Sequence, residues 1–133
     1  MQFNIRKLEV SDLDTLKAWW AAYPDWGAPP VDMLPGNGTT GFIVEHKQTP
    51  VVAGFIYFTN AKVSWLEWII SNPTFKNKKE AIFLLINTIE KVLKEKQTKY
   101  VFSICRNKNL KKYFKELGYH VDDKPSYEII KTI

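Results

Sequence analysis

Apolar residues recur along the chain with two periods, one typical of strands and one typical of helices. Alternation of apolar and polar positions predicts a strand over 3–8, and apolar positions three or four apart predict a short helix over about 12–22. The clearest helix runs from 80 to 96, where five apolar residues form one stripe. Further strands are expected at 41–46, 51–58, 62–71, 99–105 and 126–133, and a further helix at 109–117.

The order of these elements predicts an α/β (α+β) fold with a mixed, mostly antiparallel sheet. Strands 41–46 and 51–58 form a hairpin, and strand 62–71 extends it as an antiparallel meander. The strand–helix–strand unit over 62–105 requires a parallel pair with a right-handed crossover. The run KYVFSIC at 99–105 is expected to be a buried strand. Helices then cover both faces of the sheet. Because no linker or repeat interrupts the pattern, one domain over 1–133 is expected.

The chain of 133 residues carries a formal net charge of +5, and nearly all of its positively charged residues are lysines. This charge suits an anionic ligand such as nucleotide phosphates, although composition alone favours a solvated surface. Only Arg6 and Arg106 are arginines, and no aromatic residues are interleaved on the lysine-rich face of the helix at 109–117. Nucleic acid is therefore disfavoured as a partner.

The composition also disfavours several other classes of protein. Cys105 is the single cysteine, so no internal disulfide forms, and its apolar strand indicates a core residue rather than a nucleophile. His46 and His120 are far apart in sequence, so no metal site is expected. No stretch approaches the ~20 apolar residues of a membrane span, and the first ten residues have no apolar signal core. A cytoplasmic protein that does not cross a membrane is expected.

Two segments carry the candidate chemistry. The first, residues 65–85, reads WLEWIISNPTFKNKKEAIFLL, in which a strand ends, a basic loop follows and the long helix begins. Free N–H groups at a helix start bind phosphate, and Lys76, Lys78 and Lys79 would add positive charge. The second segment, residues 107–119, reads NKNLKKYFKELGY and predicts a short helix that ends at a glycine.

Together the two segments resemble the GNAT superfamily of N-acetyltransferases, whose fold has the same order of elements. The family's pyrophosphate loop has the form Gln/Arg-x-x-Gly-x-Gly/Ala and follows a proline, here Pro73. Ala81 matches the last position of the loop, Lys76 is a basic substitute for the first, and Lys79 replaces the central glycine. The resemblance implies that the cofactor, acetyl-CoA, is bound by Lys76, Asn77, Lys78, Lys79, Glu80 and Ala81.

The second segment keeps the family's C-terminal spacing, Asn-x-x-Ala-x-x-Leu-Tyr-x-x-x-Gly-Phe, from Asn107 to Gly118. The resemblance therefore implies that Asn107 and Phe114 also contact the cofactor. The tyrosine that usually protonates the leaving thiolate aligns with Phe114, which has no proton to give. Tyr113, the next residue along the helix, or water is left for that role. The compact length and the proline-rich loop also resemble small GNAT-like proteins of bacteriophages.

The resemblance further implies a general base and a donor to the thioester carbonyl. Glu67 lies six residues before Pro73, at the family's offset for a glutamate base. Its tryptophan and isoleucine neighbours are expected to raise its pKa toward neutrality, whereas the alternative is that Glu67 points into solvent. A backbone N–H from Ile69, Ile70 or Ser71, at a strand bulge, would polarise the carbonyl.

The loop over 23–40 contains four prolines and three glycines, which is typical of a binding loop. Trp65 and Trp68 are expected on opposite faces of their strand, and Trp20 fits the apolar stripe of its helix. The residues expected to contact the acceptor are Trp19, Tyr23, Trp26 and Met33.

The predicted function is transfer of an acetyl group from acetyl-CoA to an amine on a small molecule or a protein. A homodimer is one expected form of the protein. The alternative is a module of the same fold that binds acyl-CoA, a protein or nucleic acid without turnover, because Lys79 and Phe114 depart from the family's pattern.

Overall fold

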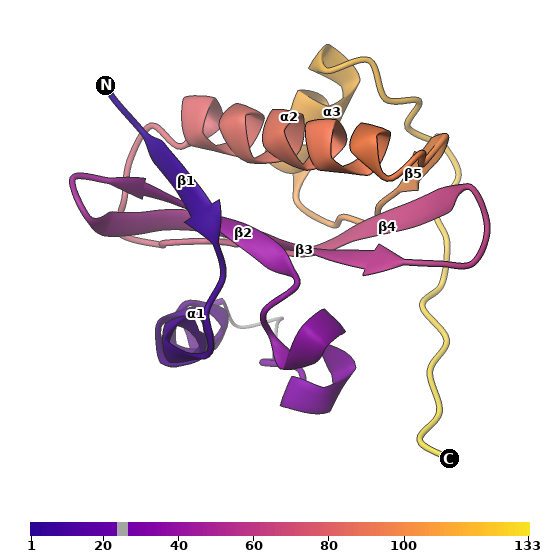
Figure 1. Cartoon of the computed structure of the whole chain (residues 1–133), viewed down its shortest axis with the longest axis horizontal. Helices are drawn as coiled ribbons and strands as arrows, with labels where there is room; N and C mark the ends of the chain where they lie inside the picture. Colours follow the sequence, from indigo (N-terminus) through magenta and orange to yellow (C-terminus); the bar gives the residue numbers. More distant parts are fainter. Residues whose placement is uncertain (24–26) are drawn as a thin grey trace.

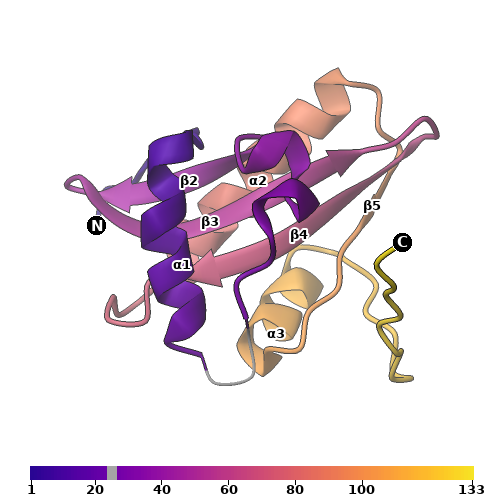
Figure 2. The same ribbon diagram turned by 90° about the horizontal axis from the view of Figure 1, so that it is seen from below.

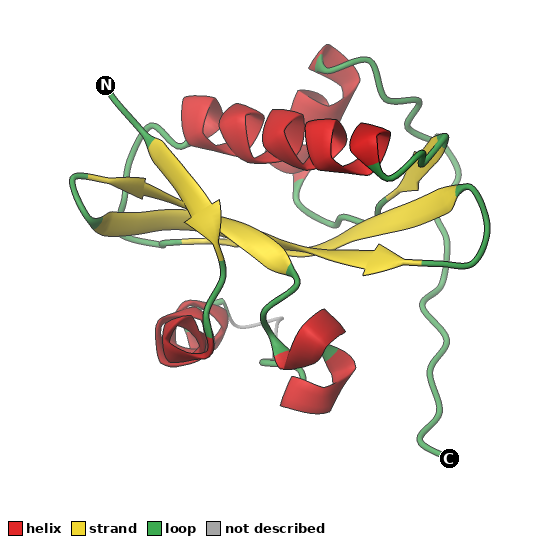
Figure 3. Ribbon diagram, in the orientation of Figure 1, coloured by secondary structure: helices red, strands yellow, loops and turns green. Residues whose placement is uncertain are grey.

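The computed structural model describes residues 1–23 and 27–133. Its strands are β1 (Asn4–Lys7), β2 (Gly41–His46), β3 (Thr49–Phe58), β4 (Val63–Ser71) and β5 (Tyr100–Phe102). Its α-helices are α1 (Leu13–Ala21), α2 (Lys79–Glu95) and α3 (Lys108–Glu116). Helix α1 and the short 3-10 turns over 31–37 lie on one face of the sheet, and α2 and α3 lie on the other (Figure 1, Figure 3).

The sheet has the order β1-β2-β3-β4-β5. The first four strands pair antiparallel, whereas β4 and β5 pair parallel and are connected through α2. The predicted mixed, mostly antiparallel sheet with helices on both faces is therefore confirmed. The β2–β3 turn is tight because Lys47 and Gln48 both adopt positive φ, at 48° and 68°, which is the twist that a two-residue hairpin needs.

Each face of the sheet has its own core. The predicted stripe of α2 is buried against β2, β3 and β4, on the face that includes Leu66. The opposite face is packed by α1, where Leu16 and Trp20 are buried against Ile43 and Phe55. In both cases the helical period of the apolar residues gives the helix one dry side. No helix in the described ranges is long and apolar enough to span a membrane.

The C-terminal part of the prediction is wrong in two respects. Residues 126–133 do not form a strand, and the chain leaves α3 as an extended loop (Figure 2). Strand β5 is short and open rather than buried, with Phe102 53% exposed. Beyond its pairing with β4, strand β5 has no second strand beside it among the described residues. Alternation in sequence gives the period of a strand but does not specify its partner.

Candidate active site

The parallel pairing of β4 with β5 stops partway along β4. The paired residues run from Val63 with Tyr100 to Trp65 with Phe102, and β4 then continues to Ser71 without β5 beside it. The chain after β5 turns toward α3, which starts at Lys108 (Figure 2). On its β5 side, the second half of β4 therefore has no hydrogen-bonded strand partner among the described residues. This is the region where the resemblance to the GNAT superfamily predicts the cofactor.

Glu67 lies just past the point where the two strands separate. It pairs with Phe55 of β3, and cross-strand partners share a face, so Glu67 is on the face of the sheet that α1 covers. The backbone N–H of Ile104 donates to Glu67 Oε1 at 2.8 Å. This contact connects the two diverging segments through the candidate base.

The environment of Glu67 raises the pKa of its carboxyl from 4.5 to about 7. Burial is the largest cause, because a half-buried carboxylate loses hydration. The Ile104 N–H lowers the pKa and the negative charge of Glu128 raises it. A carboxyl with this pKa changes protonation state near neutral pH, which suits a group that accepts a proton from an ammonium. The alternative of a fully solvated side chain does not describe this glutamate.

A β-bulge follows Glu67 directly. Glu67 pairs with Phe55 but Ile70 pairs with Ala53, so two residues of β4, Trp68 and Ile69, lie opposite one residue of β3. Trp68 has a φ of 55°, which is rare for a bulky side chain and marks a constrained position. A bulge removes backbone groups from the regular hydrogen-bonding pattern of the sheet. The first of the predicted N–H donors, Ile69, lies within this bulge, and the other two, Ile70 and Ser71, follow it directly.

The bulge also changes which face Trp68 occupies. Trp68 Nε1 donates to Tyr57 Oη at 2.8 Å, and Tyr57 Oη donates to the carbonyl of Met33 at 2.6 Å. Because Tyr57 pairs with Trp65, both tryptophans lie on the α1 face. The expectation of opposite faces is wrong, since the extra residue of the bulge restores Trp68 to the side that Trp65 occupies.

The start of α2 presents N–H groups that no side chain caps. Lys78 is the N-cap residue and makes no side-chain capping bond. In the preceding loop Asn77 has a φ of 61°, whereas Lys79 already begins the helix. The replacement of the family's central glycine by Lys79 therefore does not force this lysine into left-handed backbone. Together with exposed Lys76, the loop can attract an anion at the helix start.

Two of the loop lysines are already engaged by other side chains. Lys78 Nζ donates to Ser71 Oγ at 3.1 Å, at the end of β4. Lys79 Nζ pairs with Glu116 Oε2 at 3.0 Å and lies 5.7 Å from the ring centroid of Tyr113. Lys79 thus links α2 to α3 in the present arrangement. Glu80 is exposed and Ala81 is buried in the α2 core.

The site residues predicted in the second segment, residues 107–119, mainly stabilise helix α3 and its packing. Asn107 is the N-cap of the helix, with its Oδ1 accepting from the N–H groups of Asn109 and Leu110. Phe114 is 3% exposed and packs in the core. The ring of Tyr113 packs edge-to-face against the ring of Phe83 of α2, with the ring centroids 5.7 Å apart. This contact lies on the α2 face of the sheet, opposite to the face of Glu67, so the structure does not bring Tyr113 and Glu67 together.

The residues expected on the acceptor side are partly brought together. Tyr23 Oη donates to the carbonyl of Ser71 at 3.2 Å, which places it at the end of β4. Met33 is held through its carbonyl by Tyr57. Trp19 is 6% exposed and packs in the α1 core, like Trp20. Trp26 lies outside the described residues.

Cys105 is half-buried against the α2 core, and burial raises the pKa of its thiol. A neutral thiol is a weak nucleophile, in agreement with its predicted packing role. Within the described part of the chain, no group of three or more His, Cys, Asp or Glu side chains could hold a metal ion.

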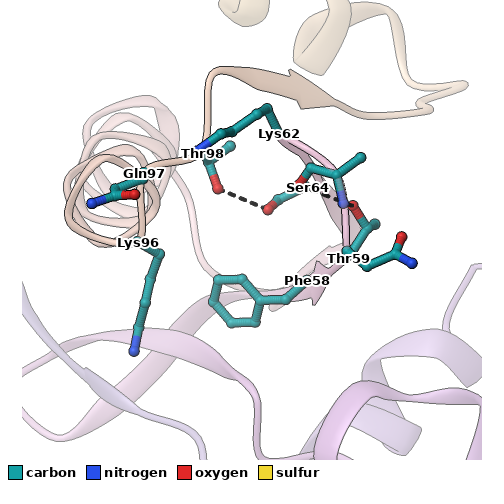
Figure 4. A pocket seen from close by; sticks show the side chains of 9 residues that line it. Phe58, Thr59, Lys62, Ser64, Lys96, Gln97 and Thr98 are labelled. Carbon is teal, nitrogen blue, oxygen red and sulfur yellow. Dashed lines mark hydrogen bonds between the residues drawn. The ribbon is translucent and has the colours of Figure 1, made fainter.

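The hollow drawn in Figure 4 is remote from this chemistry. It has a volume of about 260 Å³ and lies between the β3–β4 turn and the end of α2, lined by Phe58, Ser64 and Thr98 among others. Ser64 and Thr98 are hydrogen-bonded to each other at 2.9 Å. The start of α2 is at the opposite end of that helix, so the hollow is separate from the loop at 76–81.

Sequence reasoning did not find the Ile104 N–H or the charge of Glu128, both of which act on Glu67. Neither residue carries a local signal, because each reaches Glu67 only through the fold. The contact of Lys79 with Glu116 was missed for the same reason, since the two residues are on different helices.

No family model matches the chain, and no curated protein matches it. Solved structures do match. An acetyltransferase of Trypanosoma brucei has a TM-score of 0.70 at 14% identity, over 97% of this chain and 100% of its own. The ribosomal-protein-S18-alanine N-acetyltransferase of Escherichia coli has a TM-score of 0.72 at 13% identity, over 88% of this chain and 77% of its own.

A Mycobacterium tuberculosis protein crystallised with coenzyme A has a TM-score of 0.72 at 14% identity, over 93% of this chain and 76% of its own. At these identities the likeness is one of fold. The chain therefore has the fold of the two acetyltransferases and of this coenzyme A-bound protein, as its resemblance to the GNAT superfamily predicted.

Proposed function

We propose that this protein is an N-acetyltransferase that uses acetyl-CoA to acetylate an amine. The observation that carries the proposal is Glu67, whose carboxyl has a pKa raised to about 7 at the point where β4 and β5 separate. A general base is most effective when its pKa is near the working pH. The fold shared with acetyltransferases, and with a protein crystallised with coenzyme A, supports the same reaction class.

The residues of this chain fit the cofactor at three places. The uncapped start of α2, with Lys76 and Lys78 nearby, would bind the phosphates. The second half of β4, which has no β5 partner in the described residues, would accept an extended arm as an added strand. The bulge at Trp68 and Ile69 would direct an N–H toward a carbonyl oxygen. The resemblance implies that Asn107 and Phe114 also contact the cofactor. In this chain they would contribute to cofactor binding by keeping α3 in position.

Acetyl-CoA, when bound, supplies an activated acetyl group as a thioester. Glu67 would take a proton from the ammonium of the acceptor, directly or through one water, which leaves a neutral amine able to attack. Ile104 holds one carboxylate oxygen of Glu67 by its N–H, so the other oxygen remains to receive the proton. Tyr23 and Met33 lie on the α1 side, where the acceptor would approach.

The source of the proton for the departing thiolate differs from the family's pattern. Phe114 is a buried core residue and Tyr113 contacts Phe83 on the other face, so water is the better donor. This observation also favours a second candidate, a module that binds acyl-CoA without turnover. The narrower resemblance to bacteriophage proteins and the cytoplasmic location stay predictions, as does the span of a single domain over 1–133.

Release of free coenzyme A tests the proposal with a panel of amines that includes polyamines, aminoglycosides and peptides with free N-termini. Glu67→Gln should lower turnover by ~10²-fold or more, since glutamine keeps the size of the side chain but cannot take a proton. Acetyl-CoA binding, measured by calorimetry, should barely change because the phosphates would contact the start of α2, away from Glu67.

The matched control is Glu95→Gln, which removes the same charge from an exposed position on α2 and should leave turnover unchanged. Binding of acetyl-CoA without turnover on any amine would support the binding module instead. Absence of any binding at millimolar acetyl-CoA would contradict both functions.

A further inference from the structure

A hydrogen-bonded cluster lies at the end of β4, between α1 and the loop that precedes α2. Tyr23 follows α1, and its ring packs against the α1 core. Its Oη lies 3.2 Å from the carbonyl oxygen of Ser71 and 3.3 Å from Ser71 Oγ. Lys78 Nζ lies 3.1 Å from the same Oγ. Because Ser71 is the last residue of β4 and β4 ends beside α1, three separate segments meet at this one hydroxyl (Figure 2).

The chemistry of the three residues fixes the direction of each hydrogen bond in the cluster. An ammonium only donates, so Ser71 Oγ accepts from Lys78. A carbonyl only accepts, so the Tyr23 hydroxyl gives its one proton to the Ser71 carbonyl. The remaining contact, between the two hydroxyls, therefore takes its proton from Ser71 and is accepted by Tyr23 Oη. Both hydroxyl protons are thus engaged, and the cluster has one consistent arrangement.

The loop between Ser71 and Lys78 is also ordered by its own hydrogen bonds. Asn72 Nδ2 donates to the carbonyl of Pro50 at 3.0 Å, which anchors the start of the loop to β3. Asn72 Oδ1 accepts from the N–H and the hydroxyl of Thr74, at 3.0 and 2.9 Å. The bond between Lys78 and Ser71 closes the base of the loop, since these two residues flank it. The Lys78 side chain is therefore held at the place where β4 ends and α2 begins.

We propose that Tyr23 and Ser71 are positioning residues for the phosphates of the cofactor, because together they hold the ammonium of Lys78 at the start of α2. The inference rests on the proposed function, in which acetyl-CoA binds at this helix start. The sequence predicts Tyr23 as an acceptor contact, whereas this role assigns its hydroxyl to the cofactor.

The held lysine can still bind a phosphate. An ammonium has three N–H donors and the bond to Ser71 needs one of them, so Lys78 can also donate to phosphate oxygens. Its charge then adds to the uncapped N–H groups of α2, which favour an anion. A side chain that is already ordered loses less conformational freedom when a ligand binds. The bonds from Ser71 and Tyr23 should therefore tighten acetyl-CoA binding without any direct contact with the cofactor.

Calorimetry of acetyl-CoA binding to the full chain tests the inference. Ser71→Ala removes the acceptor of the Lys78 bond, and Tyr23→Phe removes the hydroxyl that holds Ser71. Each change should raise the Kd for acetyl-CoA about two- to tenfold, the cost of ordering one long side chain. The kcat at saturating acetyl-CoA, with the most active amine of the panel, should stay unchanged. Lys78→Met removes the charge itself and should raise the Kd at least as much as Ser71→Ala.

The decisive measurement repeats the two changes in the Lys78→Met background. If Tyr23 and Ser71 act through Lys78, then Ser71→Ala and Tyr23→Phe should leave the Kd of that variant unchanged. A general structural role would weaken binding equally in both backgrounds, which would overturn the inference. Ser64→Ala is the matched control, because Ser64 is a hydrogen-bonded serine at the other end of β4. This control should bind acetyl-CoA as tightly as the wild type.

The failure of this inference differs from the failure of the proposed function. Unchanged Kd values for Ser71→Ala and Tyr23→Phe, in a chain whose wild type binds and uses acetyl-CoA, would refute the positioning role alone. A higher KM for the amine in Tyr23→Phe, with an unchanged Kd for acetyl-CoA, would refute it too and return Tyr23 to the acceptor. Absence of acetyl-CoA binding by the wild type would contradict both.

Discussion

Replacing Glu67 with glutamine should change how the free energy of unfolding depends on pH. In the folded chain, burial raises the pKa of this carboxyl from 4.5 to about 7. Between those two values the folded state holds a proton that the unfolded state has released, so the stability of the wild type falls as pH rises through this interval. Glutamine does not ionise there, so the variant lacks this loss of stability.

The magnitude follows from the interval. At about 1.36 kcal/mol for each pH unit, the rise from 4.5 to about 7 corresponds to an upper limit of about 3 kcal/mol. Glu67 is half-buried, and solvent screens part of its charge, so we expect about 1–2 kcal/mol. The glutamine side-chain carbonyl can still accept a hydrogen bond from the Ile104 N–H. Loss of that hydrogen bond therefore does not contribute to the difference in stability between the variant and the wild type.

Urea unfolding followed by tryptophan fluorescence, at about pH 4.5 and about pH 8, measures this effect. Relative to the wild type, Glu67→Gln should gain about 1–2 kcal/mol between the two conditions. Glu95→Gln, at an exposed position, should gain almost nothing. If Glu67→Gln shows the same difference from the wild type at both pH values, burial does not raise the pKa of Glu67, and the case for it as a base fails.

Three further substitutions have defined outcomes. Glu116→Gln releases Lys79 from its 3.0 Å ion pair, and acetyl-CoA should bind about two- to five-fold more tightly by calorimetry at low salt; unchanged affinity would mean that Lys79 does not reach the phosphates. Phe114→Tyr places a hydroxyl in the core and should lower the free energy of unfolding by about 1–3 kcal/mol in urea, whereas an unchanged midpoint would show that the hydroxyl finds a partner. Trp68→Phe removes the donor to Tyr57, and a double-mutant cycle with Tyr57→Phe should give a coupling of about 1 kcal/mol; a coupling near zero would show that this bond does not hold the bulge.

Much of the candidate site was predictable because its parts are local. The offset of Glu67 from Pro73 and the apolar run around it are both visible in the sequence, as is the basic loop before the long helix. The raised pKa of Glu67 agrees with the expectation from its tryptophan and isoleucine neighbours, because burial is its main cause. The groups that adjust this pKa, Ile104 and Glu128, are more than thirty-five residues away in sequence and could not be predicted.

The sequence by itself determined the elements whose signal is periodic. Helix α2 extends over Lys79–Glu95, close to the predicted 80–96, because one apolar stripe is enough to define a dry helix face. The hairpin of β2 and β3 and the strand β4 were likewise predicted, since alternation and a short turn specify neighbours along the chain.

Only the tertiary structure decided what depends on contacts between distant segments. The bulge at Trp68 turns that side chain to the face of Trp65, which a strict two-residue period does not allow. Residues 126–133 have the period of a strand but form none, because a strand exists only where another strand accepts its hydrogen bonds. Phe114 keeps the spacing of a proton donor's position and yet is a core residue, since packing of α3 determines where that position faces.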